Sequence, residues 1–171
     1  MSQNMTKETL QAFTPDQQRA IERFVAGELT FAELEGFSSA QAEEIASLGH
    51  QLYGQGALED ARTLFEGLAA INHHDPYPQQ LLGAIADKQG RWEDAMAHYR
   101  RCLELSPGNQ LARMRLGLLQ LHHGEPEEGV SELSELCRQD PQSESELGRR
   151  ARLILMAMAD VAGRVDAIAR A

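Results

Sequence analysis

A repeat of 34 residues restricts what this chain can fold into more than any other feature of its sequence. The dipeptide Leu-Gly occurs at residues 48–49, 82–83 and 116–117, and a second glycine follows each pair by seven residues. Two more positions keep the interval, and they are occupied by Ala61, Ala95 and Gly129 and by Phe65, Tyr99 and Leu133. Because these positions stay in register over three consecutive segments, we predict repeats at residues 42–75, 76–109 and 110–143.

The period and the pattern are those of the tetratricopeptide repeat (TPR), which is a helix–turn–helix unit. A small residue after each Leu lets the first helix of a repeat approach the second. Gly56, Gly90 and Gly124 are expected to end the first helices in a left-handed conformation. The sequence therefore predicts an all-α TPR solenoid of three repeats, with N-terminal helices before them and a capping helix after them.

The third repeat departs from the pattern at two positions. Pro126 stands where the other repeats carry Leu58 and Trp92, and it is acceptable as the first residue of a helix. Gly129 replaces the alanine of the second helix, at an expected cost of about 1 kcal/mol relative to Ala. We therefore expect the second helix of repeat three to be the least stable element. Trp92 itself is expected in the core.

Residues 14–41 carry helix signals of their own, and residues 1–13 are expected to be flexible. Thr14 and Pro15 are typical of an N-cap followed by the first helical residue. One apolar stripe follows, made of Ile21, Phe24 and Val25. This stripe either forms the seam of a homodimer or folds back on repeat one, and both alternatives stay open. Gly27 would end the helix, and a capping box at residues 30–33 predicts a short second helix.

Residues 144–171 are predicted to form a C-terminal capping helix that begins near Leu147. Its apolar positions keep helical spacing, at Leu147, Ala151, Ile154, Leu155, Met158, Val161 and Ile168. An open stack of repeats needs such a terminal element, with one face toward the last repeat and one toward solvent. The arginines at 149, 150, 152 and 164 are expected on the solvated face.

Composition and charge exclude several classes of function. The formal net charge of −10 argues against nucleic-acid binding, which needs Lys and Arg at phosphates, and favours a neutral or basic partner. No apolar run is long enough to insert into a membrane, and no signal peptide is visible, so we expect a cytoplasmic protein. Cys102 and Cys137 are far apart in sequence, which agrees with a reduced state.

No pattern in the sequence predicts catalysis, a metal or a cofactor. The pairs His73-His74 and His122-His123 lack the spacing of metal ligands, because adjacent side chains diverge. The glycines are explained by helix ends and packing, so no phosphate-binding loop remains. Cys102 falls on the buried side of a helix and is expected to be a small core residue. We expect no enzyme activity.

Four segments go beyond a generic TPR pattern. They are Arg23–Thr30, Leu52–Gly56, Leu64–Leu68 and Asn72–Asp75, the last with His73 where a repeat proline is expected. In these segments the chain resembles the class II chaperones of type III secretion, the SycD/LcrH family. The resemblance covers about residues 19–160, and it is weaker in repeat three.

The resemblance implies a cytoplasmic chaperone for the hydrophobic translocator proteins of a secretion apparatus. In that family an extended translocator segment lies in the concave groove of the repeats, and the N-terminal helix often mediates homodimerisation. Tyr53 matches a pocket tyrosine of the family, whereas two other pocket aromatics are replaced by Ala46 and His50. The alternative is a TPR scaffold that links components of a signalling, motility or envelope complex outside secretion.

The first helix of each repeat lines the concave face of a TPR solenoid, which defines the candidate groove. The residues predicted there in repeats one and two are Ala46, His50, Tyr53, Tyr77, Gln80 and Ala84, with Lys88 placed to orient a peptide carbonyl or carboxylate. Repeat three contributes only apolar side chains, namely Leu111, Met114, Leu118 and Leu121. Apolar residues on a solvated face point to a pocket for an apolar anchor of a bound peptide. The alternative is that Leu118 and Leu121 pack under the C-terminal helix.

Overall fold

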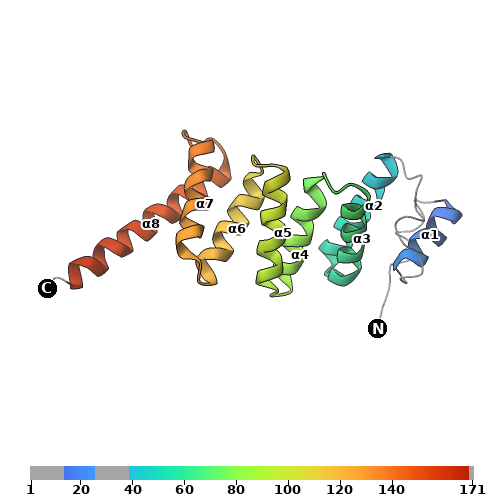
Figure 1. Ribbon diagram of the computed structural model, residues 1–171, viewed down its shortest axis with the longest axis horizontal. Helices are drawn as coiled ribbons and strands as arrows, with labels where there is room; N and C mark the ends of the chain where they lie inside the picture. The colour runs from blue at the N-terminus through green and yellow to red at the C-terminus, as the bar shows by residue number, and fades with distance from the viewer. Residues whose placement is uncertain (1–13, 26–38, 170–171) are drawn as a thin grey trace. The chain divides into compact units, whose positions relative to one another are not determined.

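The computed structural model describes residues 14–25 and 39–169 of the chain, and these form eight helices and no strand (Figure 1). The helices are α1 (Pro15–Val25), α2 (Ser39–Gln55), α3 (Leu58–Ile71), α4 (Pro76–Lys88), α5 (Trp92–Leu105), α6 (Gln110–His122), α7 (Pro126–Gln139) and α8 (Glu146–Ala169). The predicted all-α class is confirmed. Within the described ranges no helix is both long and apolar enough to cross a membrane.

The chain divides into two compact units, Met1–Gly90 and Arg91–Ala171. Unit 1 contains α1 to α4, and unit 2 contains α5 to α8. The boundary falls at the turn between the two predicted helices of repeat two. The predicted division into N-terminal helices, repeats and capping helix is a division of sequence pattern, and it stays a prediction.

The glycines that were expected to end the first helices do so. Gly56, Gly90 and Gly124 have φ angles of 80°, 71° and 95°, a left-handed conformation that side chains with a Cβ atom rarely adopt. Each lies just beyond the end of α2, α4 or α6. The chain can therefore reverse in a short turn and enter the next helix.

Helix α1 begins as predicted and packs against the rest of unit 1. Thr14 and Gln17 cap it reciprocally, because the backbone NH of Thr14 donates to Gln17 Oε1 (2.8 Å) and the NH of Gln17 to Thr14 Oγ1 (3.4 Å). The side chain of Ile21 is 3% exposed and belongs to the core of unit 1. The predicted capping box at residues 30–33 and the end of the helix at Gly27 lie outside the described residues.

The core of unit 1 is built by α2, α3 and α4. Its buried side chains are Ile45, Leu48, Leu52, Ala61, Leu64, Phe65, Leu68, Leu81, Leu82 and Ile85. A Cβ atom on Gly49 would lie 2.9 Å from the ring of Phe65, so the absent side chain lets α2 and α3 meet at this ring. The predicted role of Gly49 in close helix packing is confirmed.

Helices α6 and α7 make an even closer contact in unit 2. A Cβ atom on Gly129 would lie 2.7 Å from the carbonyl oxygen of Gly117. From the sequence, Gly129 was expected only to destabilise this helix. That interpretation was incomplete, because the missing side chain is what allows the two backbones to approach.

Asp140 joins the end of α7 to the start of α8. It is the C-cap residue of α7, and its carboxylate accepts hydrogen bonds from the backbone NH of Glu144 (2.9 Å) and from the NH and hydroxyl of Ser145 (2.9 and 2.7 Å). The hydroxyl of Ser145 in turn accepts from the NH of Gly148 (2.9 Å). These bonds, with the Ser145 hydroxyl as the largest cause, lower the pKa of Asp140 below its usual value.

The described side chains of α8 divide into a packed and an exposed face as expected, with one exception, and the side chains of Arg164 and Ile168 lie outside the described residues. Ala151 is fully buried, and Leu147, Ile154 and Leu155 pack against the same cluster. Arg149, Arg150 and Arg152 are exposed. Two of them also bond to the preceding turn, Arg149 to the carbonyls of residues 143 and 144 and Arg152 to that of residue 141. Val161 was predicted on the packed face but is 58% exposed.

The prediction that Trp92 lies in the core is wrong. Its side chain is 47% exposed and stacks on His123, with ring centroids 4.1 Å apart and planes inclined by 21°. As the first residue of α5 it has no helical turn before it to pack against, so His123, at the end of α6, covers one face of the indole. Cys102, by contrast, is fully buried as predicted.

Candidate functional site

Unit 1 contains a cavity of about 710 Å³ between the N-terminal half of α2, the end of α3 and the start of α4. Helix α2 contributes Ala42, Glu43, Ala46, Ser47 and His50. The end of α3 and the following turn contribute Leu68, Ile71, Asn72 and Asp75, and α4 contributes Tyr77. The volume lies in the range of pockets that hold small ligands or peptide side chains.

Two aromatic rings, those of His50 and Tyr77, line this cavity, and the ring of Phe65 lies in the core beside them. The rings of His50 and Tyr77 have centroids 5.8 Å apart, and the ring of Phe65 lies 6.1 Å from His50 and 6.2 Å from Tyr77. Both contacts of Phe65 are close to perpendicular, at 85° and 73°, which is a favoured geometry for aromatic pairs. Because Phe65 is fully buried, it fixes the other two rings from behind.

Most of the rest of the lining is divided between apolar residues, here called the floor (Ala46, Leu68 and Ile71), and polar residues, here called the lip (Glu43, Ser47, Asn72 and Asp75). Ala46 and Leu68 belong to or pack against the core of unit 1, and Ile71 is 41% exposed. Asp75 is the N-cap of α4, where its Oδ1 accepts from the backbone NH of Tyr77 (2.9 Å). Burial, and after it the charge of Asp75, raise the pKa of the Tyr77 phenol. The site therefore offers apolar floor area, two ring surfaces and carboxylates at its edge.

Tyr53 and Lys88 form a second feature of unit 1, near the C-terminal ends of α2 and α4. The ammonium of Lys88 lies 3.8 Å from the centroid of the Tyr53 ring, which is within the range of a cation–π interaction. Tyr53 is half-buried and Lys88 is exposed. The ring therefore holds the cation in place while leaving it accessible to solvent.

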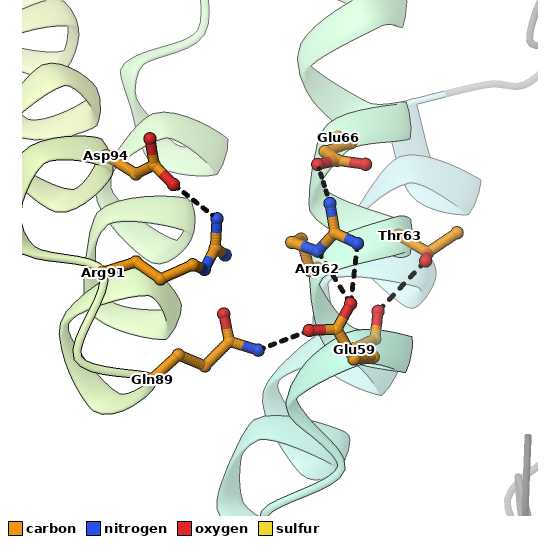
Figure 2. A network of polar contacts seen from close by, with 7 residues as sticks. All are labelled: Glu59, Arg62, Thr63, Glu66, Gln89, Arg91 and Asp94. Atoms are coloured by element: carbon orange, nitrogen blue, oxygen red, sulfur yellow. Dashed lines mark hydrogen bonds and ion pairs between the residues drawn. The ribbon is translucent and has the colours of Figure 1, made fainter. Parts of the chain in front are cut away.

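A polar network holds the end of α4 against α3 beside this pair. Figure 2 shows Gln89, the residue after Lys88, donating from Nε2 to Glu59 Oε1 (2.6 Å). Arg62 binds both Glu59 (2.6 Å) and Glu66 (2.8 Å) and thereby orients Glu59. The hydrogen bond to Glu59 is the main cause that raises the pKa of Arg62. In unit 2 the same figure shows a separate pair, Arg91 and Asp94 (2.7 Å).

The structure brings three of the predicted groove residues of unit 1 together. Ala46, His50 and Tyr77 all line the cavity. Gln80 and Ala84 are half-buried on α4 and do not line it. Their role as peptide contacts stays a prediction, as does that of Tyr53 and Lys88.

In unit 2 the expectation of four solvated apolar residues is wrong for Met114. It is 2% exposed and forms a buried cluster with Leu133, Leu136 and Ala151. Leu118 and Leu121 are half-buried and pack against that cluster together with Leu147, Ile154 and Leu155 of α8. This is the alternative in which they pack under the C-terminal helix, and the physical reason is that α8 offers a matching apolar face. Leu111 alone is exposed, at 40%.

The N-terminal stripe divides in a similar way. Ile21 packs into the core of unit 1, which corresponds to the alternative that the stripe folds back on repeat one. The side chains of Phe24 and Val25 lie outside the described residues, so their part in a dimer seam stays a prediction.

Sequence reasoning missed more than half of the residues that line the cavity. Leu68, Ile71, Asn72 and Asp75 were not placed in the groove, because only first helices of repeats were expected there. A signal was present, since Asn72–Asp75 is the turn that departs from the repeat proline. The same turn carries His73 and His74, whose rings lie 4.0 Å apart. Among the described residues, no three His, Cys, Asp or Glu side chains are grouped so that they could hold a metal ion.

Comparison with known proteins agrees with the repeat pattern. The tetratricopeptide repeat family matches residues 88–149. Low calcium response locus protein H of Yersinia pestis is 34% identical over 86 residues, which is 50% of this chain and 51% of that protein. The chain thus matches about half the length of that relative.

Solved structures extend the similarity to most of the fold. The translocator chaperone SycD of Yersinia enterocolitica, in a structure described as an alternative dimer, has a TM-score of 0.65 and 26% identity, over 73% of this chain and 96% of that chain. SycD in complex with a peptide of the translocator YopD has a TM-score of 0.67 and 24% identity, over 73% of this chain and 97% of that chain. By sequence and by fold, this chain is therefore similar to low calcium response locus protein H and to SycD, which agrees with the resemblance seen in its sequence.

Proposed function

We propose that this protein is a cytoplasmic, non-catalytic chaperone that binds extended apolar segments of secreted translocator proteins. The observation that carries the proposal is the cavity of unit 1, which is lined by three side chains predicted from sequence to contact a peptide, Ala46, His50 and Tyr77. The complex of SycD with a YopD peptide supports it, because that protein has the same fold.

The chemistry of the cavity suits such a segment. A disordered chain presents single apolar side chains, and a cavity of about 710 Å³ with an apolar floor can shield one or two of them from water. Ordering the segment costs conformational entropy, so the affinity per buried area is modest and release is easy. Binding of this kind keeps apolar segments from aggregating without folding them.

Homodimerisation is also part of the proposal. The SycD structure described as an alternative dimer supports it. Ile21 is buried within unit 1, so of the three residues predicted for the seam we assign it to Phe24 and Val25. Sedimentation of the Phe24→Ser/Val25→Ser variant tests this, and a mass equal to that of the parent chain argues against the seam.

The chaperone function is tested by filling the cavity. Ala46→Trp places an indole in the cavity, whereas Ala97→Trp adds the same side chain to an exposed position of α5. Tagged parent and variant chains are used to capture partners from the host cell, followed by mass spectrometry. We expect the parent chain and Ala97→Trp to recover a secreted, membrane-active protein, and Ala46→Trp to lose it.

The same experiment separates the chaperone from a TPR scaffold outside secretion. A scaffold that uses other surfaces would keep its partners when Ala46 is replaced by Trp, and those partners would not be secreted. Replacement of Leu118 and Leu121 by Asp is a poorer test, because it would place two charges against the core cluster of unit 2, whereas Ala46→Trp keeps the new side chain apolar. Loss of binding in such a variant would also follow from unfolding.

A further inference from the structure

The lip of the cavity in unit 1 is acidic. Among the residues that line it, Glu43 and Asp75 carry carboxylates, and none is a lysine or an arginine. Glu43 is exposed on α2 and Asp75 is half-buried at the start of α4. The two carboxylates therefore come to the cavity from separate segments, Glu43 from α2 and Asp75 from the N-cap of α4.

The surroundings strengthen the effect of these charges on a ligand. The floor is apolar at Ala46, Leu68 and Ile71, and a low-dielectric wall concentrates the field of a nearby charge. Asp75 lies close to the ring wall, because its Oδ1 accepts from the backbone NH of Tyr77 (2.9 Å), and after burial its charge contributes to raising the pKa of that phenol. The net charge of −10 adds a long-range attraction for cations.

We propose that this cavity selects segments in which an apolar anchor is flanked by lysine or arginine. The anchor would occupy the floor at Ala46, Leu68 and Ile71. The aliphatic stem of the basic side chain would lie along the rings of His50 and Tyr77, and its cation would lie at Glu43 and Asp75. Lysine and arginine generally bury their stems along apolar surface in this way while the charged group stays at a polar site. The inference rests on the proposed function, and it adds the charge pattern of the bound segment.

Three fluorescein-labelled peptides of 15 residues test this selectivity. They share a Gly-Ser background with Leu at positions 5, 8 and 11, and they differ only at positions 7 and 9, which are both Lys, both Gln or both Glu. Fluorescence anisotropy against the full chain measures each affinity at low and high salt. We expect the Lys peptide to bind about tenfold more tightly than the Glu peptide, with a difference that shrinks as salt is added.

A matched pair of variants tests whether the preference for the Lys peptide comes from a carboxylate of the lip. Glu43→Gln removes a lining carboxylate, whereas Glu44→Gln removes its exposed neighbour on α2, which does not line the cavity. We expect Glu43→Gln to reduce the preference for Lys about threefold and Glu44→Gln to leave it unchanged. Asp75 is left intact because it caps α4.

The outcomes distinguish a failure of the charge selectivity from a failure of the proposed chaperone function. If the parent chain binds the three peptides equally, or if Glu44→Gln lowers the preference as much as Glu43→Gln, the charge selectivity is wrong while the chaperone function stands. If none of the three peptides binds, the cavity is not a site for apolar segments, and the proposed function loses its main support.

Discussion

Gly129 of helix α7 lies so close to Gly117 of helix α6 that a Cβ atom on Gly129 would stand 2.7 Å from the Gly117 carbonyl oxygen. The same atom would stand 2.8 Å from Cγ of Leu121 and 2.9 Å from its backbone nitrogen. Two of these three contacts are with backbone, which cannot move away as a flexible side chain can. Glycine is therefore a packing requirement at this position.

We predict that Gly129→Ala destabilises the protein even though alanine is the better helix former. The substitution gains up to about 1 kcal/mol of helix propensity, but forcing a methyl group into a packed interface typically costs about 1–3 kcal/mol. Because two of the close contacts are with backbone, we expect a cost toward the upper end of this range and a net loss of about 1–2 kcal/mol, which corresponds to a Tm lower by about 3–6 °C in a chain of this size. Differential scanning calorimetry measures the change.

Gly54→Ala is the matched control for this substitution. Gly54 lies within α2, and a Cβ atom built there meets nothing within 4 Å. Helix propensity then acts alone, so we expect Tm to stay the same or to rise. A rise in Tm for both variants would show that α6 and α7 are not in close contact at Gly129.

Much of the fold could be predicted because the decisive residues act locally. Gly56, Gly90 and Gly124 end helices through their own backbone conformation, and Thr14 caps α1 through a bond to a residue three positions away. Such signals are written in short stretches of sequence. Gly129 could not be interpreted in the same way, because its role depends on how closely another helix approaches.

The candidate site was predictable only in part, for the same reason. The spacing of α2 placed Ala46 and His50 on one face, and the cavity confirms that they share a surface. Leu68, Ile71 and Asp75 reach the cavity from the end of α3 and the turn after it, which no helical period reveals. Met114 was misplaced because the apolar face of α8 that covers its cluster lies more than 30 residues further along the chain.

Truncation of the apolar residues of α6 should therefore destabilise the protein by different amounts. Met114→Ala removes a side chain that is 2% exposed in the core cluster of unit 2, and we expect a loss of about 2–4 kcal/mol. Leu111→Ala truncates a side chain that is 40% exposed and should cost less than about 1 kcal/mol. Urea denaturation monitored by circular dichroism measures both. Equal small losses would mean that Met114 faces solvent after all.

Asp140 should make the junction of α7 and α8 sensitive to acid. Its pKa in the folded protein is lowered, chiefly by the hydrogen bond from the Ser145 hydroxyl. The stabilisation is therefore fully present above the unfolded pKa of about 3.9 and is lost as pH falls through the folded value. We predict that Asp140→Asn lowers Tm at pH 7 and that its difference from the parent chain narrows toward pH 3. Thermal unfolding across this range provides the measurement.

Asp16→Asn is the control for the acid experiment. This carboxylate is exposed on α1 and forms an ion pair with Arg19 (3.6 Å), which is also exposed. Its replacement should change Tm little at any pH in the window. If Asp140→Asn and Asp16→Asn behave alike, the hydrogen bonds of Asp140 do not hold the junction.

Lys88 and Tyr53 should be coupled energetically, because the ammonium lies 3.8 Å from the ring centroid. We predict a coupling of about 0.5–1 kcal/mol in a double-mutant cycle of Lys88→Gln and Tyr53→Leu, measured by urea denaturation. Tyr53→Phe removes only the hydroxyl and keeps the ring face, so it should retain most of this coupling with Lys88, whereas Tyr53→Leu removes the ring and should lose it. Additive single and double variants would show that the ring does not hold the cation. In that case Lys88 would have no fixed position from which to orient a bound segment, and its proposed place in the groove would lose its structural basis.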